Sequence, residues 1–220
     1  MILPPIYPIL DTGTLAQRGI SPVTAAEAFL EAGGGILQYR HKGFFAAETF
    51  EEAHRIANLC SDARAHFVLN DRADYAALLN AGLHVGQDDL APEDARKALG
   101  PQAILGFSTH NADQMRAAQT TPADYLAFGP IFATVTKQNP DRTTGIEGLK
   151  EIRKITAKPL VAIGGITLSS AEACFEAGAD SVAVISGLLP EAPTKTALRA
   201  RMTEWLQLSV ILHKWQRPHP

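Results

Sequence analysis

The chain has 220 residues, of which 46% are apolar and 20% charged, values typical of a globular protein with one large domain or two small ones. No apolar run reaches the length of a membrane span, so we expect no membrane partner. The net charge of −3 argues against non-specific nucleic-acid binding, but it allows a local basic pocket for a phosphorylated small molecule.

The first residues lack the charged-then-apolar pattern of a secretory signal peptide. Cys60 and Cys174 lie far apart in the sequence, each in an amphipathic stretch. This context favours reduced core thiols over a disulfide or a metal site. We therefore expect a cytoplasmic protein.

Along the chain, short apolar runs alternate with longer segments of helical period. The predicted strands are 6–10, 36–39, 66–69, 83–85, 104–107, 125–128, 160–163 and 181–185. The predicted helices are 23–32, 47–60, 73–80, 92–99, 112–119, 148–155, 169–177 and 194–212. Strict alternation predicts a parallel sheet with right-handed crossovers, and eight such units predict an α/β fold closed into a single (β/α)8 TIM barrel. This domain would span residues 1–220, with a tail of about 210–220 beyond the last barrel helix.

Glycines punctuate this alternation. Gly33, Gly82 and Gly178 each fall between a predicted helix and the next predicted strand. A helix C-cap at such a point favours a residue with positive φ.

The second predicted strand ends in a run of donor-bearing side chains. Gln38, Arg40 and Lys42 stand at every second position, so in a strand they share one face. Two cations beside an amide suit a polyanion such as a diphosphate. The alternative is a solvated strand edge, since Lys and Arg are mostly exposed.

Acidic residues follow the next two strands. Asn70 and Asp71 end the third, and Asp88 and Asp89 follow the fourth. In a TIM barrel these ends are neighbours at the catalytic rim, and carboxylates facing a diphosphate there predict a bridging Mg²⁺. The alternatives are an N-cap role for Asp71 and a solvated turn at the other two acids.

The seventh and eighth strands end in small residues. Gly164-Gly165 follows one, and Ile185-Ser186-Gly187 ends the other. Loops seven and eight of TIM barrels, with a short extra helix, form a recurrent phosphate site, and residues 188–190 have the length for that helix. The alternative for the two glycines is a tight turn. Two anion sites on one rim predict two phosphorylated substrates.

A long polar loop runs between Gly129 and Gly145 and contains Thr134, Thr136 and Lys137. A loop of this length in a compact domain is usually functional or disordered. It is either a lid that closes over substrates or a hydrophilic surface connector.

These motifs together resemble the thiamine phosphate synthase family over nearly the whole chain. The resemblance covers residues 38–42, 70–74, 82–90, 106–110, 129–132, 134–137 and 161–166. It implies an enzyme that joins hydroxymethylpyrimidine diphosphate to a thiazole phosphate, or to its carboxylated form, with Mg²⁺. The products would be thiamine phosphate and pyrophosphate.

The resemblance also implies roles for individual residues. The pyrimidine diphosphate would be bound by Gln38, Arg40, Lys42, Asn70 and Lys137, with Ser108 beside the pyrimidine, and Mg²⁺ by Asp71 and Asp89. The thiazole phosphate would be bound by Thr134, Thr136, Gly165, Ile185 and Ser186. The family's dissociative chemistry needs electrostatic stabilisation of the leaving pyrophosphate by Arg40, Lys42 and Lys137 rather than a nucleophile or general base. His84 and His110 would then be structural.

Two other functions compete with this one. A thiazole tautomerase of the same fold carries a histidine where this chain has Pro130, and a non-catalytic thiazole phosphate sensor is expected to lose the metal acids that this chain retains. The chain departs from the family at Leu10, where a threonine is common, and in an apolar C-terminal segment, which suggests a homodimer contact.

Overall fold

The computed structural model describes the backbone of residues 2–134 and 142–213, with side chains up to Ser209. Its strands are β1 (Ile6–Asp11), β2 (Ile36–Arg40), β3 (His66–Asn70), β4 (Gly82–Val85), β5 (Leu105–Thr109), β6 (Tyr125–Phe128), β7 (Leu160–Ile163) and β8 (Ser181–Val184). Its helices are α1 (Thr12–Gln17), α2 (Pro22–Glu31), α3 (Ala47–Asp62), α4 (Ala73–Leu78), α5 (Pro92–Leu99), α6 (Ala112–Ala118), α7 (Gly145–Ile155), α8 (Ala171–Glu176), α9 (Lys195–His213) and the 3₁₀ helix η1 (Ser186–Leu188).

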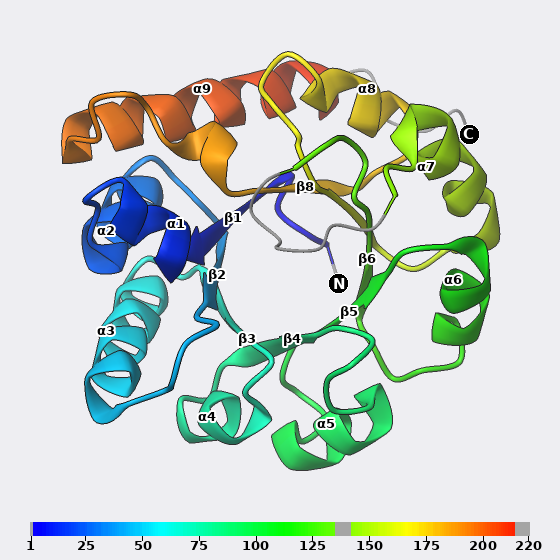
Figure 1. The fold of residues 1–220 in the computed structure, drawn as a ribbon, viewed down its shortest axis with the longest axis horizontal. Coiled ribbons are helices and arrows are strands. Elements are labelled where there is room, and N and C mark those ends of the chain that lie inside the picture. The colour runs from blue at the N-terminus through cyan, green and yellow to red at the C-terminus, as the bar shows by residue number, and fades with distance from the viewer. Residues whose placement is uncertain (1, 135–141, 214–220) are drawn as a thin grey trace.

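The strands form a closed barrel in sequence order, and every neighbouring pair is parallel. Figure 1 looks into this barrel, with the helices arranged around the outside. Helix α9 packs against α2 and α8, next to the place where β8 pairs with β1. The predicted TIM barrel is therefore confirmed, with strand bounds within two residues and helix bounds within three of those predicted.

The apolar side chains form two layers, as expected when strand residues alternate between the two faces of a closed sheet. The inner layer fills the barrel and includes Tyr7, Ile9 and Tyr125. The outer layer lies between the strands and the helices and includes Ile6 and Leu10. The inner layer carries several polar groups, and these become important at the site.

Two short helices differ from the prediction. Helix α1 has no counterpart among the predicted elements, because its six residues are too few to show a period. The short helix after β8 begins at Ser186 rather than at residue 188. Gly33 and Gly178 have the predicted positive φ, but Gly82 lies within β4, and the positive φ before it belongs to Asn80.

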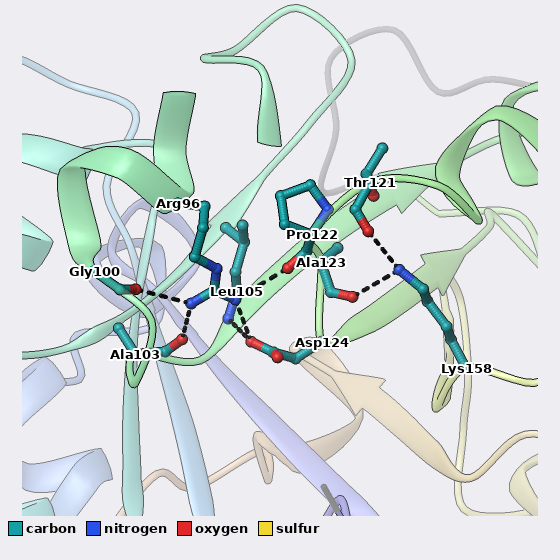
Figure 2. Close-up of polar contacts among 9 residues, drawn as sticks. All are labelled: Arg96, Gly100, Ala103, Leu105, Thr121, Pro122, Ala123, Asp124 and Lys158. Atoms are coloured by element: carbon teal, nitrogen blue, oxygen red, sulfur yellow. Dashed lines mark hydrogen bonds and ion pairs between the residues drawn. The ribbon is translucent and has the colours of Figure 1, made fainter. Parts of the chain in front are cut away.

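A polar clamp joins β5 and β6 at their amino ends, on the side of the barrel opposite the strand ends discussed below (Figure 2). The Asp124 carboxylate accepts hydrogen bonds from the Leu105 N–H and from Arg96, both at 2.7 Å. Arg96 also donates to backbone carbonyls of Gly100, Ala103 and Pro122. Since Asp124 and Arg96 satisfy backbone groups at the start of β5 and in the adjoining loops, we interpret this clamp as a stability feature.

Both cysteines are free and buried, as predicted. Burial raises the pKa of Cys174 to about 11 and that of Cys60 to about 12, which keeps the thiols protonated and unreactive. Over the described residues, no helix combines the length and the apolar character needed to cross a membrane.

Candidate active site

A cavity of about 450 Å³ lies at the carboxyl ends of the strands and extends into the barrel. It is lined by every predicted site residue that the structure describes: Gln38, Arg40, Lys42, Asn70, Asp71, Asp89, Ser108, Thr134, Gly165, Ile185 and Ser186. Thr136 and Lys137 lie outside the described residues. Leu10 does not line the cavity, because it faces the helices on the outer side of β1.

Strand β2 places its donor side chains as its alternation predicts. Gln38, Arg40 and Lys42 all line the cavity, as a shared face predicts. Arg40 forms an ion pair with Asp11, which the sequence reasoning missed. Asp11 is buried, and its other oxygen caps α1 by accepting from the Thr14 N–H at 2.8 Å. A capping pattern between Asp11 and Thr14 was the available signal.

The two predicted metal ligands lie together. The Asp71 and Asp89 carboxyls are within hydrogen-bonding range of each other, and Lys42 Nζ lies 2.5 Å from Asp71 Oδ2. Burial raises the pKa of Asp71 above its usual value; Lys42 opposes this shift, and Asp89 adds to it. Asp89 also accepts a hydrogen bond from the Gly86 N–H at 2.7 Å.

The N-cap alternative for Asp71 is wrong. The N-cap of α4 is Arg72, which makes no side-chain capping bond, and Asp71 precedes it with a φ of 65°. A non-glycine residue in this left-handed region is uncommon. The unusual backbone conformation places Asp71 at the cavity, beside Lys42 rather than at the helix end.

Asn70 carries an unpaired donor in the same wall. Its side chain is buried, and its Nδ2 atom has no hydrogen-bond partner within the described part of the chain. An unpaired buried donor costs free energy, and such groups often await a ligand or a water molecule. Because Asn70 also lines the cavity, its amide is available to an anion bound there.

The opposite wall brings together the ends of β7 and β8, where Gly165, Ile185 and Ser186 line the cavity. Gly165 has a φ of 64°, and a Cβ atom there would lie 2.3 Å from the carbonyl oxygen of Ala133. The glycine is therefore needed for close approach of two backbone segments, and a side chain at this position would collide with the neighbouring backbone.

A chain of buried side-chain hydrogen bonds forms the floor of the cavity. Gln38 Nε2 donates to the Tyr7 hydroxyl at 3.1 Å, and the Tyr7 and Tyr125 hydroxyls are 2.9 Å apart. The Tyr125 hydroxyl lies 2.9 Å from His84 Nδ1, and His84 Nε2 lies 2.8 Å from Ser108 Oγ. The expectation that His84 is merely structural missed its place in this chain, which crosses five strands.

The comparisons with known proteins identify the family. The family model described as thiamine monophosphate synthase matches residues 6–188. The chain belongs to this family. Thiamine-phosphate synthase of Koribacter versatilis (strain Ellin345) is 44% identical over 214 residues, which cover 96% of this chain and 97% of that protein. Thiamine-phosphate synthase 1 of Aquifex aeolicus (strain VF5) is 34% identical over 213 residues, with coverage of 95% and 98%.

A solved structure supports the same family membership. Thiamine phosphate pyrophosphorylase from Pyrococcus furiosus superposes on this member of the thiamine monophosphate synthase family with a TM-score of 0.82. It is 28% identical and covers 94% of this chain and 96% of its own. The family predicted from the motifs is thus confirmed.

Proposed function

We propose that the chain is a thiamine-phosphate synthase, a transferase that joins hydroxymethylpyrimidine diphosphate to a thiazole phosphate. The observation that carries this proposal is one cavity that gathers the cationic face of β2, two adjoining carboxyls and an unpaired buried amide. The family membership and the names of the relatives support the same activity.

The two walls of the cavity would separate the two substrates. Gln38, Arg40, Lys42, Asn70 and Lys137 would bind the pyrimidine diphosphate, with Ser108 beside the pyrimidine ring. The thiazole phosphate would be bound by Thr134, Thr136, Gly165, Ile185 and Ser186. Asp11 adds to this set, because its ion pair holds the Arg40 guanidinium at the cavity.

Mg²⁺ fits the acidic pair. Two carboxyls within hydrogen-bonding range repel each other when both are ionised, and burial strengthens that repulsion. Within the described residues, no cluster of three or more His, Cys, Asp or Glu side chains gathers to hold a metal. Asp71 and Asp89 would hold the ion, and Mg²⁺ is commonly bound by one or two carboxylates plus substrate phosphates. When bound, it would neutralise charge on the departing pyrophosphate.

The side chains support chemistry without a protein nucleophile. Arg40, Lys42 and Lys137 would stabilise the developing charge of the leaving pyrophosphate. The thiazole nitrogen would then capture the pyrimidine-methyl cation. In this scheme the protein holds both substrates in line and excludes water, and no side chain forms a covalent bond.

Incubation of the purified chain with both phosphorylated substrates and Mg²⁺ tests the proposal. Formation of thiamine phosphate and pyrophosphate is the expected result. A tautomerase would alter only the thiazole, and a sensor would alter neither substrate. Either of those outcomes would refute the synthase assignment.

Other expectations accompany this proposal. The absence of a nucleic-acid partner stays a prediction. The cytoplasmic location and the homodimer contact of the apolar C-terminal segment stay predictions.

A further inference from the structure

The hydrogen-bond chain beneath the cavity has a direction. An amide nitrogen can only donate, so Gln38 Nε2 donates a hydrogen bond to the Tyr7 oxygen. Among the described residues, the Tyr125 oxygen is the acceptor within reach of the Tyr7 hydroxyl proton, so Tyr7 donates to Tyr125 and the Tyr125 proton is directed to His84 Nδ1. Each hydroxyl accepts on one side and donates on the other.

This direction fixes the tautomer of His84. The Nδ1 atom accepts from Tyr125, so the ring is neutral and carries one proton. Burial favours this form by lowering the pKa of His84 to about 4; Asp89 opposes this shift, and Lys42 adds to it. Because Nδ1 accepts from Tyr125, that proton is on Nε2. The Nε2–H group therefore donates to Ser108 Oγ across 2.8 Å.

Ser108 is the last member of the chain, and it lines the cavity. Its oxygen accepts from His84, and the described residues provide no second partner for its hydroxyl proton. That proton is free to point into the cavity, which Ser108 lines.

We infer that Tyr7, Tyr125 and His84 are positioning residues that hold the Ser108 hydroxyl as a hydrogen-bond donor, matched to an acceptor atom such as an unprotonated ring nitrogen. The identity of that ligand as the pyrimidine of the diphosphate substrate rests on the proposed function, whereas the tautomer does not. The same polarity prevents His84 from taking the Ser108 proton, so the two residues do not form an activated nucleophile pair.

Nitrogen NMR of the ligand-free protein tests the tautomer directly. With ¹⁵N-labelled imidazole rings, and the His84 signals assigned by their loss in His84→Asn, we expect Nε2 to be protonated and Nδ1 to be unprotonated. An Nδ1–H tautomer would show that His84 donates to Tyr125 and that the chain runs in the opposite direction, from Ser108 to Tyr7, and would overturn the inference.

Substitution of Gln38 tests what sets the direction. Gln38→Glu replaces the donor by an acceptor of the same shape, and at about pH 9 its carboxylate is ionised even if burial raises its pKa. The direction should then reverse and move the His84 proton to Nδ1. Gln114→Glu is the matched control, because it adds the same charge to the same cavity while its Oε1 still accepts from the His110 N–H. It should leave the tautomer unchanged, and an unchanged tautomer in both variants would contradict the inference.

Tyr125→Phe provides a kinetic readout. The substitution removes the donor to His84 Nδ1, so the ring loses its tautomer preference and Ser108 loses its fixed direction. We expect the KM for the pyrimidine diphosphate to rise about tenfold, as for one lost hydrogen bond in a desolvated site, with an unchanged KM for the thiazole phosphate. Equal changes in both KM values would indicate a general structural defect and reject the positioning role.

The two proposals fail separately. If the wild-type chain forms no thiamine phosphate while the NMR shows the Nε2–H tautomer, the proposed function fails and the polarity of the chain stands. If thiamine phosphate forms and the tautomer is Nδ1–H, only the positioning inference fails.

Discussion

Replacement of Asn70 by leucine should make the free protein more stable and its anion site weaker. The Asn70 Nδ2 atom is buried and without a partner in the described part of the chain, and leaving such a donor unsatisfied costs about 1–3 kcal/mol. Asn70→Leu keeps a similar volume and removes the unpaired donor. For a chain of this size, each kcal/mol shifts Tm by about 2–4 °C, so we expect a rise of about 2–12 °C.

The anion site should change in the opposite direction. Pyrophosphate with Mg²⁺, at about 100 times its Kd, would stabilise the wild type by about 2.7 kcal/mol. Loss of one hydrogen bond to a charged group weakens binding by about 10- to 100-fold. The ligand-induced stabilisation of Asn70→Leu should then fall to about 0.4–1.4 kcal/mol.

Thermal and urea denaturation with and without pyrophosphate measure both effects. Ser181→Ala is the matched control, since the Ser181 hydroxyl is the other buried side-chain group without a partner among the described residues, and it lies away from the cavity. The control should be at least as stable as the wild type and keep the full response to pyrophosphate. An Asn70→Leu variant that is less stable and still responds fully would refute the assignment of Asn70 to the anion site.

Three further predictions address the metal pair, the clamp and the long loop. Asp71→Asn and Asp89→Asn should each abolish activity at limiting Mg²⁺. Asp71→Asn should not lower the free energy of unfolding at neutral pH, because the pKa of Asp71 is raised in the folded protein and folding therefore disfavours its ionised carboxylate. The contribution of Asp71 to stability accordingly falls as the pH rises above the ordinary pKa range of a carboxyl group. Unchanged Mg²⁺ dependence in both variants would reject the metal site. Arg96→Met should lower the free energy of unfolding by about 2–4 kcal/mol with kcat unchanged, because it removes several charge-assisted bonds, whereas Arg116→Met, which breaks only an exposed pair with Asp113, should cost less than about 1 kcal/mol. Equal costs in urea denaturation would contradict the role of the clamp. Lys137→Ala should reduce kcat, with a loss of about 2–4 kcal/mol in transition-state stabilisation, more than it raises KM. Normal turnover would show that Lys137 does not contact the leaving group.

The barrel could be predicted from the sequence because each strand and each helix leaves a local pattern of apolar residues. Apolar runs and amphipathic segments have fixed periods, and their alternation specifies parallel strands with helical crossovers. The shared face of Gln38, Arg40 and Lys42 followed from the same two-residue period. The adjacency of Asp71 and Asp89 required one additional rule, that sequential strands of a barrel are neighbours.

Other features were decided only by the tertiary structure. Asp71 could have capped α4, and the backbone conformation that places it at the cavity has no sequence signal, since φ is positive there without a glycine. The need for Gly165 depends on the Ala133 carbonyl, which belongs to a different loop. Sequence alone could not identify these contacts because each depends on how closely two distant segments approach.

The hydrogen-bond chain beneath the cavity shows the same limit. Tyr7 and Tyr125 are separated by 118 positions, and in the sequence each is an aromatic residue of a predicted strand with no mark of a hydrogen-bonding role. The sequence determined which residues face into the barrel, because the strand period fixes the side of each residue. Closure of the barrel decided which inward residues meet, because it brings five different strands around one small interior.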